Sequence, residues 1–90
     1  MAVKRMFSSS VTETDNFYSL PIKSQLLYFR FGMHQTTGGK VLAPHSIMRW
    51  SGFSNTDLEP LILAGFVSIR DNEVFVAFSA REVKRFKKER

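Results

Sequence analysis

Residues 44–78 have the sequence PHSIMRWSGFSNTDLEPLILAGFVSIRDNEVFVAF, and this segment predicts the architecture of the chain. Pro44 suits the first turn of a helix, and Ile47 and Trp50 follow it at helical spacing. We therefore predict a helix over about 44–51, which is the first of two helices in this segment.

A second helix is predicted over about 55–64, after a break at Gly52. Ser54 or Asn55 can cap its first turn, and Gly65 is suited to its C-terminal end. Its apolar stripe comprises Leu58, Leu61 and Ile62. The two helices are joined by a tight turn, as in a helix-turn-helix.

The end of the segment predicts a β-hairpin. Residues 66–70 and 73–78 are both rich in β-branched and aromatic side chains, which favour strands. Asp71 and Asn72 separate the two runs, and this pair tolerates the positive φ of a two-residue hairpin turn.

A longer helix is predicted toward the N-terminus, over about 21–34. Pro21 can open it, and four apolar residues follow at helical spacing. This stripe comprises Ile22, Leu26, Phe29 and Met33. Leu27, Tyr28 and Phe31 add apolar surface on other faces, so we expect this helix to be the centre of the core.

Three shorter elements complete the order. Residues 4–7 favour a β-strand, and residues 41–43 form a short apolar segment. Thr14 or Asp15 could cap a short helix. That helix would carry Phe17, Tyr18 and Leu20.

The whole order predicts an α+β fold, a winged helix-turn-helix with a helical core and a C-terminal β-hairpin wing. The helix near 55–64 takes the recognition position, with the wing tip at Asp71-Asn72. A chain of 90 residues can form only one core. We assign residues 1–80 to the winged-helix domain and residues 81–90 to a basic tail or linker.

Composition argues against several classes of protein. The absence of cysteine removes disulfides, thiol nucleophiles and cysteine-ligated metals. His34 and His45 have no pattern of carboxylates around them, so we predict no metal and no cofactor. The apolar runs are far shorter than the roughly 20 residues of a membrane span. We expect no membrane partner and a cytoplasmic location.

Enzymatic motifs fail on spacing, so we predict that the protein is not an enzyme. Gly38-Gly39-Lys40 lacks both the earlier glycine of a P-loop and the Ser or Thr after its lysine. The acidic pairs lie two residues apart at helix starts and turns, where capping explains them better than acid–base catalysis.

The net charge of +5 is concentrated at the C-terminus. Residues 81–90 contain six basic and two acidic side chains, whereas residues 1–80 contain seven and six. Such a basic segment could bind phosphates, form a solvated helix end, or link to a further part of a longer protein.

Residues along nearly the whole chain carry a resemblance to a known family. They are Lys4-Arg5-Met6-Phe7-Ser8, Thr14-Asp15, Phe17, Leu20-Pro21, Ser24-Gln25, Leu27-Tyr28-Phe29, Gly39, Val41, Pro44, Ile47, Gly52, Asp57-Leu58 and Gly65-Phe66-Val67. With them the chain resembles the N-terminal domain of phage replisome organisers, which are replication initiators. The resemblance implies a domain that binds double-stranded DNA at the phage origin, in the cytoplasm of a bacterial host cell.

The sequence departs from the family pattern in three places. Thr36-Thr37-Gly38-Gly39-Lys40 replaces an acidic turn and so removes negative charge beside the expected DNA face. Phe78-Ser79-Ala80 leads directly into the basic segment, where the family usually has a Trp and an Asn-Tyr-Ile motif. Family members are also much longer, and the resemblance assigns recruitment of the helicase loader to their C-terminal part.

The predicted DNA contacts are mainly basic side chains that could bind phosphates, although each could equally be a solvated surface charge. They are Lys4, Arg5, Lys40, His45, Arg49, Arg70, Arg81, Lys84, Arg85, Lys87 and Lys88. At the start of the recognition helix, Ser54, Asn55 and Thr56 could contact phosphates or base edges, or could simply cap the helix.

The predicted recognition helix is poorly suited to reading bases. It contains Asp57 and Glu59 but no Lys or Arg, and Pro60 removes a backbone donor from it. A second hypothesis is therefore a small phage-encoded protein-interaction module on the same fold, which forms a homo-oligomer or binds and inhibits a host protein. Its candidate interface residues are Trp50, Phe53 and Phe75, of which Trp50 also fits the core. Exposure of all three in one patch would favour this hypothesis.

Overall fold

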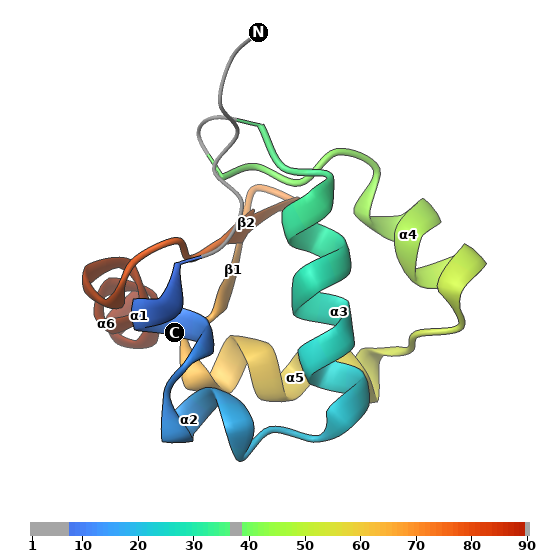
Figure 1. Cartoon of the computed structure of the whole chain (residues 1–90). Coiled ribbons are helices and arrows are strands. Elements are labelled where there is room, and N and C mark those ends of the chain that lie inside the picture. Colours follow the sequence, from blue (N-terminus) through green and yellow to red (C-terminus); the bar gives the residue numbers. More distant parts are fainter. Residues whose placement is uncertain (1–7, 37–38, 90) are drawn as a thin grey trace, which may run out of the picture.

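The computed structural model describes residues 8–36 and 39–89, which form helices and one two-stranded antiparallel sheet (Figure 1). In chain order the elements are α1 (Ser9–Thr12), α2 (Asp15–Tyr18), α3 (Ile22–Met33), α4 (Pro44–Ser51), α5 (Asn55–Ala64), β1 (Val67–Arg70), β2 (Glu73–Val76) and α6 (Ala80–Glu89). The predicted α+β class is confirmed, since a hairpin follows a helical core as in a winged helix. The strand predicted at residues 4–7 lies outside the described residues.

The core is built around α3, as predicted. Tyr28 on this helix is fully enclosed, and its ring meets Phe17 of α2 and Phe66 edge-on, with centroids 5.2 and 6.1 Å away. Phe17 and Phe66 also meet each other edge-on at 5.4 Å. The Tyr28 hydroxyl donates a buried hydrogen bond of 2.7 Å to the carbonyl of Ala77, which fixes α3 to the chain just after β2.

Of the four residues in the apolar stripe predicted on α3, only Phe29 packs against the core, and the other three are exposed. Ile22, Leu26 and Met33 are 70, 52 and 48% exposed. The buried side carries Leu27, Tyr28 and Phe31, together with the small residues Ser24 and Gly32. On this side the small Ser24 brings α3 close to α5, since its hydroxyl donates a buried hydrogen bond of 2.7 Å to the Asp57 carbonyl.

The wing is the hairpin β1–β2, with the two-residue turn that the sequence predicted. Asp71 and Asn72 have φ angles of 52° and 65°, and Arg70 pairs with Glu73 across the turn. The start of the segment predicted near 41–43, with the residues just before it, pairs with β2 through backbone hydrogen bonds and an isolated bridge, without forming a further strand. The Val41 N–H donates to the Val74 carbonyl at 2.8 Å, and the Val76 N–H donates to the Gly39 carbonyl at 2.9 Å.

A basic tail or linker was predicted for residues 81–90. In the structure, residues 80–89 form helix α6, which packs on the domain. Phe86 is only 4% exposed, and Val83 packs against the core cluster. The helix lies against α1, α5 and β1. Its start is stabilised by two local hydrogen bonds, because the Glu82 N–H donates to the Ser79 hydroxyl and the Phe78 N–H donates to the Glu82 carboxylate.

Gly65 allows α6 to approach the end of α5 closely. It has a φ of 86°, and a Cβ at this position would collide with the Val83 carbonyl and the Lys87 side chain. The absence of a side chain at this position is therefore needed for the observed packing of α6.

We expect Gly65→Ala to destabilise the protein more than Gly52→Ala. Both glycines end a helix with positive φ, so alanine at either position carries a similar backbone strain, on the order of 1–2 kcal/mol. Only at Gly65 does the new methyl group also meet α6, whereas nothing lies within 4 Å of a Cβ at Gly52. Urea unfolding of both variants measures the difference. Equal losses would contradict the packing of α6 against Gly65.

Candidate nucleic-acid interface

Most of the predicted DNA-contacting residues lie on two separate surfaces. The helix-turn-helix surface comprises His45, Arg49, Ser54, Asn55 and Thr56, from α4 and the start of α5. The α6 surface comprises Arg70, Arg81, Lys84, Arg85, Lys87 and Lys88, from the wing and α6. In Figure 1, α4 and α6 lie on opposite sides of α3. Lys4 and Arg5 fall outside the described residues.

Lys40 is held at the edge of the wing. Its ammonium group forms an ion pair of 2.9 Å with the Glu73 carboxylate, and its backbone pairs with Phe75. Both charged side chains are about half exposed, so the pair contributes little stability, but it offsets the positive charge of Lys40. Lys40 is therefore a weaker phosphate ligand than the sequence suggested.

The helix-turn-helix surface is shaped by the turn between α4 and α5. Gly52 adopts the left-handed conformation that ends α4, and Ser54 is the N-cap residue of α5. The Ser54 side chain shares a hydrogen bond of 2.7 Å with the Thr56 hydroxyl, and both residues are exposed. Ser54 thus occupies the N-cap position, one of the two residues predicted for it.

Asp57 has a structural role and does not present its charge to a ligand. Its side chain is largely buried, and its carboxylate accepts a hydrogen bond of 3.1 Å from the Ser54 N–H at the start of α5. The Lys23 ammonium lies 3.5 Å from the same carboxylate and donates to the Gly52 carbonyl at 3.1 Å. Of the two acidic residues on α5 that disfavour contact with DNA, Asp57 is therefore held within the fold, whereas Glu59 remains exposed.

A hollow of about 220 Å³ lies between α4, the start of α5 and the wing tip. Its polar lining residues are His45, Asn55 and Asn72, and the remaining lining is apolar. Such groups can donate and accept hydrogen bonds without a permanent charge, which suits base edges better than phosphates. Sequence reasoning missed Asn72 as a lining residue, because it was assigned only to the turn.

The α6 surface is the strongly basic part of the described chain. All five Lys and Arg side chains of α6 are exposed, whereas Phe86 of the same helix is buried. Arg70 connects the wing to this surface. Its guanidinium lies 4.7 Å from the Phe75 ring centroid and 5.7 Å from that of Phe86, and Arg85 lies 5.7 Å from the Phe86 centroid.

The three candidate protein-interface residues do not form one patch. Trp50 is 85% exposed beside α3, so its assignment to the core is wrong. Ile47 fills the inward side of α4 instead, and Trp50 projects past it. Phe53 is half-buried against the core, and Phe75 is half-buried beneath Arg70 on the wing. Only Trp50 is a candidate anchor for a partner.

Other kinds of site find little support in the part of the chain that the structure describes. Residues 8–36 and 39–89 contain no group of three or more His, Cys, Asp or Glu placed to hold a metal ion. Among the same residues, no helix has the length and apolar character needed to cross a membrane. On α2, the Tyr18 hydroxyl donates a hydrogen bond of 2.8 Å to the Glu13 carboxylate. This hydrogen bond raises the pKa of Tyr18.

Comparisons with protein-family models, with curated proteins and with solved structures gave no match to this chain. The resemblance to phage replisome organisers therefore stays a prediction from the residues that carry it. The two surfaces have to be interpreted from their own chemistry.

We expect Asp57→Ala to lower the free energy of unfolding by about 1–2 kcal/mol, because it removes the acceptor that caps the first turn of α5. Glu59→Ala is the matched control. It removes the same charge from an exposed position on the same helix, and it should change stability by less than about 0.5 kcal/mol. Urea unfolding at neutral pH measures both. A loss at Glu59 as large as that at Asp57 would refute the capping role.

Proposed function

We propose that this chain is a winged-helix domain that binds double-stranded DNA, holding the phosphate backbone mainly through the α6 surface. The observation that supports this most is the packing of α6. Phe86 is buried and Gly65 brings the helix close to α5, so the basic side chains project from a fixed element. Fixed cations lose less conformational freedom when they bind phosphates than cations on a mobile tail.

Arg70 extends the cationic surface from α6 onto the wing. Its guanidinium stacks on Phe75 and Phe86, which favours one orientation of a long side chain before any ligand arrives. Guanidinium groups bind phosphate oxygens through paired N–H donors, so an oriented arginine beside a row of lysines suits a nucleic-acid backbone.

Base recognition is proposed as the weaker part of binding. The helix-turn-helix surface offers His45, Asn55 and Asn72 around a hollow, but Glu59 on the exposed side of α5 repels phosphates. Most of the affinity should therefore be electrostatic and independent of sequence. On the resemblance to replisome organisers, we propose the phage origin as the preferred site and initiation of phage replication as the process.

Binding to duplex DNA across a salt series tests the α6 surface. Each phosphate contact that is lost should reduce the slope of log K against log salt by about 0.9. We expect Lys84→Gln and Lys88→Gln each to reduce the slope by that amount and to weaken binding at low salt. Arg30→Gln removes the same charge from α3, outside both surfaces, and should leave the slope unchanged.

Three outcomes would contradict the proposal. Absence of binding at low salt would reject DNA as the ligand. An equal effect of Arg30→Gln and Lys84→Gln would show that the net charge matters and the α6 surface does not. Equal affinity for origin DNA and for a mixed-sequence duplex would reject the origin as the preferred site, while leaving backbone binding intact.

A further inference from the structure

The part of the chain that contains α3 and α4 has no carboxylate side chain. Residues 21–56 include four Lys and Arg residues and two histidines, but all eight Asp and Glu residues lie outside this range. Lys23 and Lys40 pair with Asp57 and Glu73 from other parts of the chain. Arg30 has no carboxylate partner among the described residues, and its guanidinium donates only to the Ser51 hydroxyl, at 3.2 Å.

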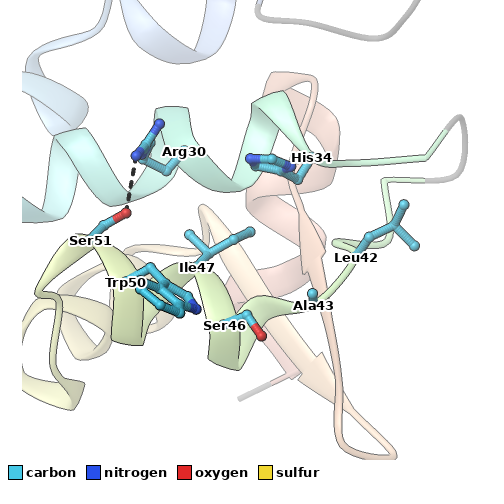
Figure 2. Close-up of a pocket in the computed structure, with 8 residues that line it drawn as sticks. All are labelled: Arg30, His34, Leu42, Ala43, Ser46, Ile47, Trp50 and Ser51. Carbon is cyan, nitrogen blue, oxygen red and sulfur yellow. Dashed lines mark hydrogen bonds between the residues drawn. The ribbon is translucent and has the colours of Figure 1, made fainter.

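A groove of about 270 Å³ runs between α3 and α4 beside this arginine. Figure 2 shows Arg30 and His34 on the α3 side of the groove and Trp50 on the α4 side. Ile47 and Leu42 supply further apolar lining, and the lining includes no acidic residue. A cavity of about 150 Å³ is enough to hold benzene, so this groove has room for one large apolar side chain.

The exposed stripe of α3 borders the groove. Arg30 lines the groove. Leu26 lies four residues before it and Met33 three residues after it, so both side chains adjoin Arg30 on the helix surface. Together with Ile22, Trp50 and Leu42, these side chains form what we call the α3–α4 face. Single exposed apolar residues are ordinary. Here two large ones line a groove and three more lie on the adjoining side of α3, which indicates an interaction surface.

We propose that the α3–α4 face binds an amphipathic helix of a partner protein that carries carboxylates beside its apolar stripe. Apolar side chains of that helix would cover Leu26 and Met33 and enter the groove beside Trp50. Its carboxylates would pair with Arg30 and with the imidazole of His34 when protonated. The 12 residues of α3 match a partner helix of about three turns, or about 18 Å. This inference goes beyond the proposed DNA binding and does not depend on it.

Charge favours this partner over a second copy of the chain. In a symmetric dimer the same surface meets itself, so each copy of Arg30 would meet a face that has no carboxylate. The net charge of +5 also opposes self-association. Nucleic acid is less suited to this face, because Ile22, Leu26 and Met33 can neither stack on bases nor bind phosphates.

The only tryptophan of the chain, Trp50, reports binding directly. The probe is an 18-residue synthetic helix without aromatic residues, with leucines along one face and glutamates on both flanks. A second peptide has lysines in place of the glutamates. We expect the acidic peptide to shift Trp50 emission to the blue at micromolar concentration, and the basic peptide to bind at least tenfold more weakly.

Matched variants locate the binding surface. Leu26→Ser and Leu63→Ser make the same change at positions with nearly equal exposure, 52 and 54%, but only Leu26 lies on the α3–α4 face. We expect Leu26→Ser to weaken the acidic peptide about tenfold and Leu63→Ser to leave its affinity unchanged. Arg30→Gln should reduce the preference for the acidic over the basic peptide. Circular dichroism checks that each variant is folded.

Four results would overturn the proposal. Two concern the peptides: no shift of Trp50 emission at millimolar acidic peptide, or equal affinity for the acidic and the basic peptide. A concentration-dependent dimer in sedimentation that Leu26→Ser dissolves would identify a second copy of the chain as the occupant. Quenching of Trp50 emission by an oligothymidine that competes with the peptide would identify nucleic acid as the occupant. None of these affects the salt slope of Lys84→Gln, so failure here is distinguishable from failure of the proposed DNA binding.

Discussion

The hydrogen bond from the Tyr28 hydroxyl to the Ala77 carbonyl connects the core, the wing and the basic helix α6. Tyr28 lies on the central helix among the rings of Phe17 and Phe66, so its hydroxyl position is fixed by packing. Ala77 follows β2 and precedes α6, and its N–H donates to the Phe66 carbonyl at 2.9 Å. One enclosed side chain therefore places the wing and the basic helix relative to the core. Leaving the buried carbonyl without its partner would cost about 1–3 kcal/mol.

This arrangement also explains why one side of α3 stays exposed. The aromatic side of α3 packs against α2, α5 and β2. The opposite side, with Ile22, Leu26 and Met33, is then left to solvent. This exposed side is the basis of the proposed protein contact.

Sequence patterns predicted the elements whose limits are set locally. Pro44 and Gly65 mark helix ends, and Asp71-Asn72 forms the predicted turn, because backbone conformation at such positions depends on the residue itself. The buried side of α3 and the exposure of Trp50 depend on contacts with distant parts of the chain, which helical spacing does not contain. Two features of the sequence could have predicted the packing of α6. Ser79 and Glu82 have the spacing of a capping box at its start, and Val83 and Phe86 lie on one side of the helix.

In the candidate site too, the sequence did not show the effect of residues that are distant in the chain. Counting charges on α5 predicted that Asp57 would oppose DNA binding, but Lys23 and the start of α5 take up that charge. Helices α6 and α4 lie on opposite sides of α3. At physiological salt the Debye length is about 8 Å, well below the 24 Å of the smallest dimension of the molecule. A bound acidic helix would thus only weakly reduce the attraction of α6 for phosphates, so one small domain could hold DNA and a partner protein at the same time.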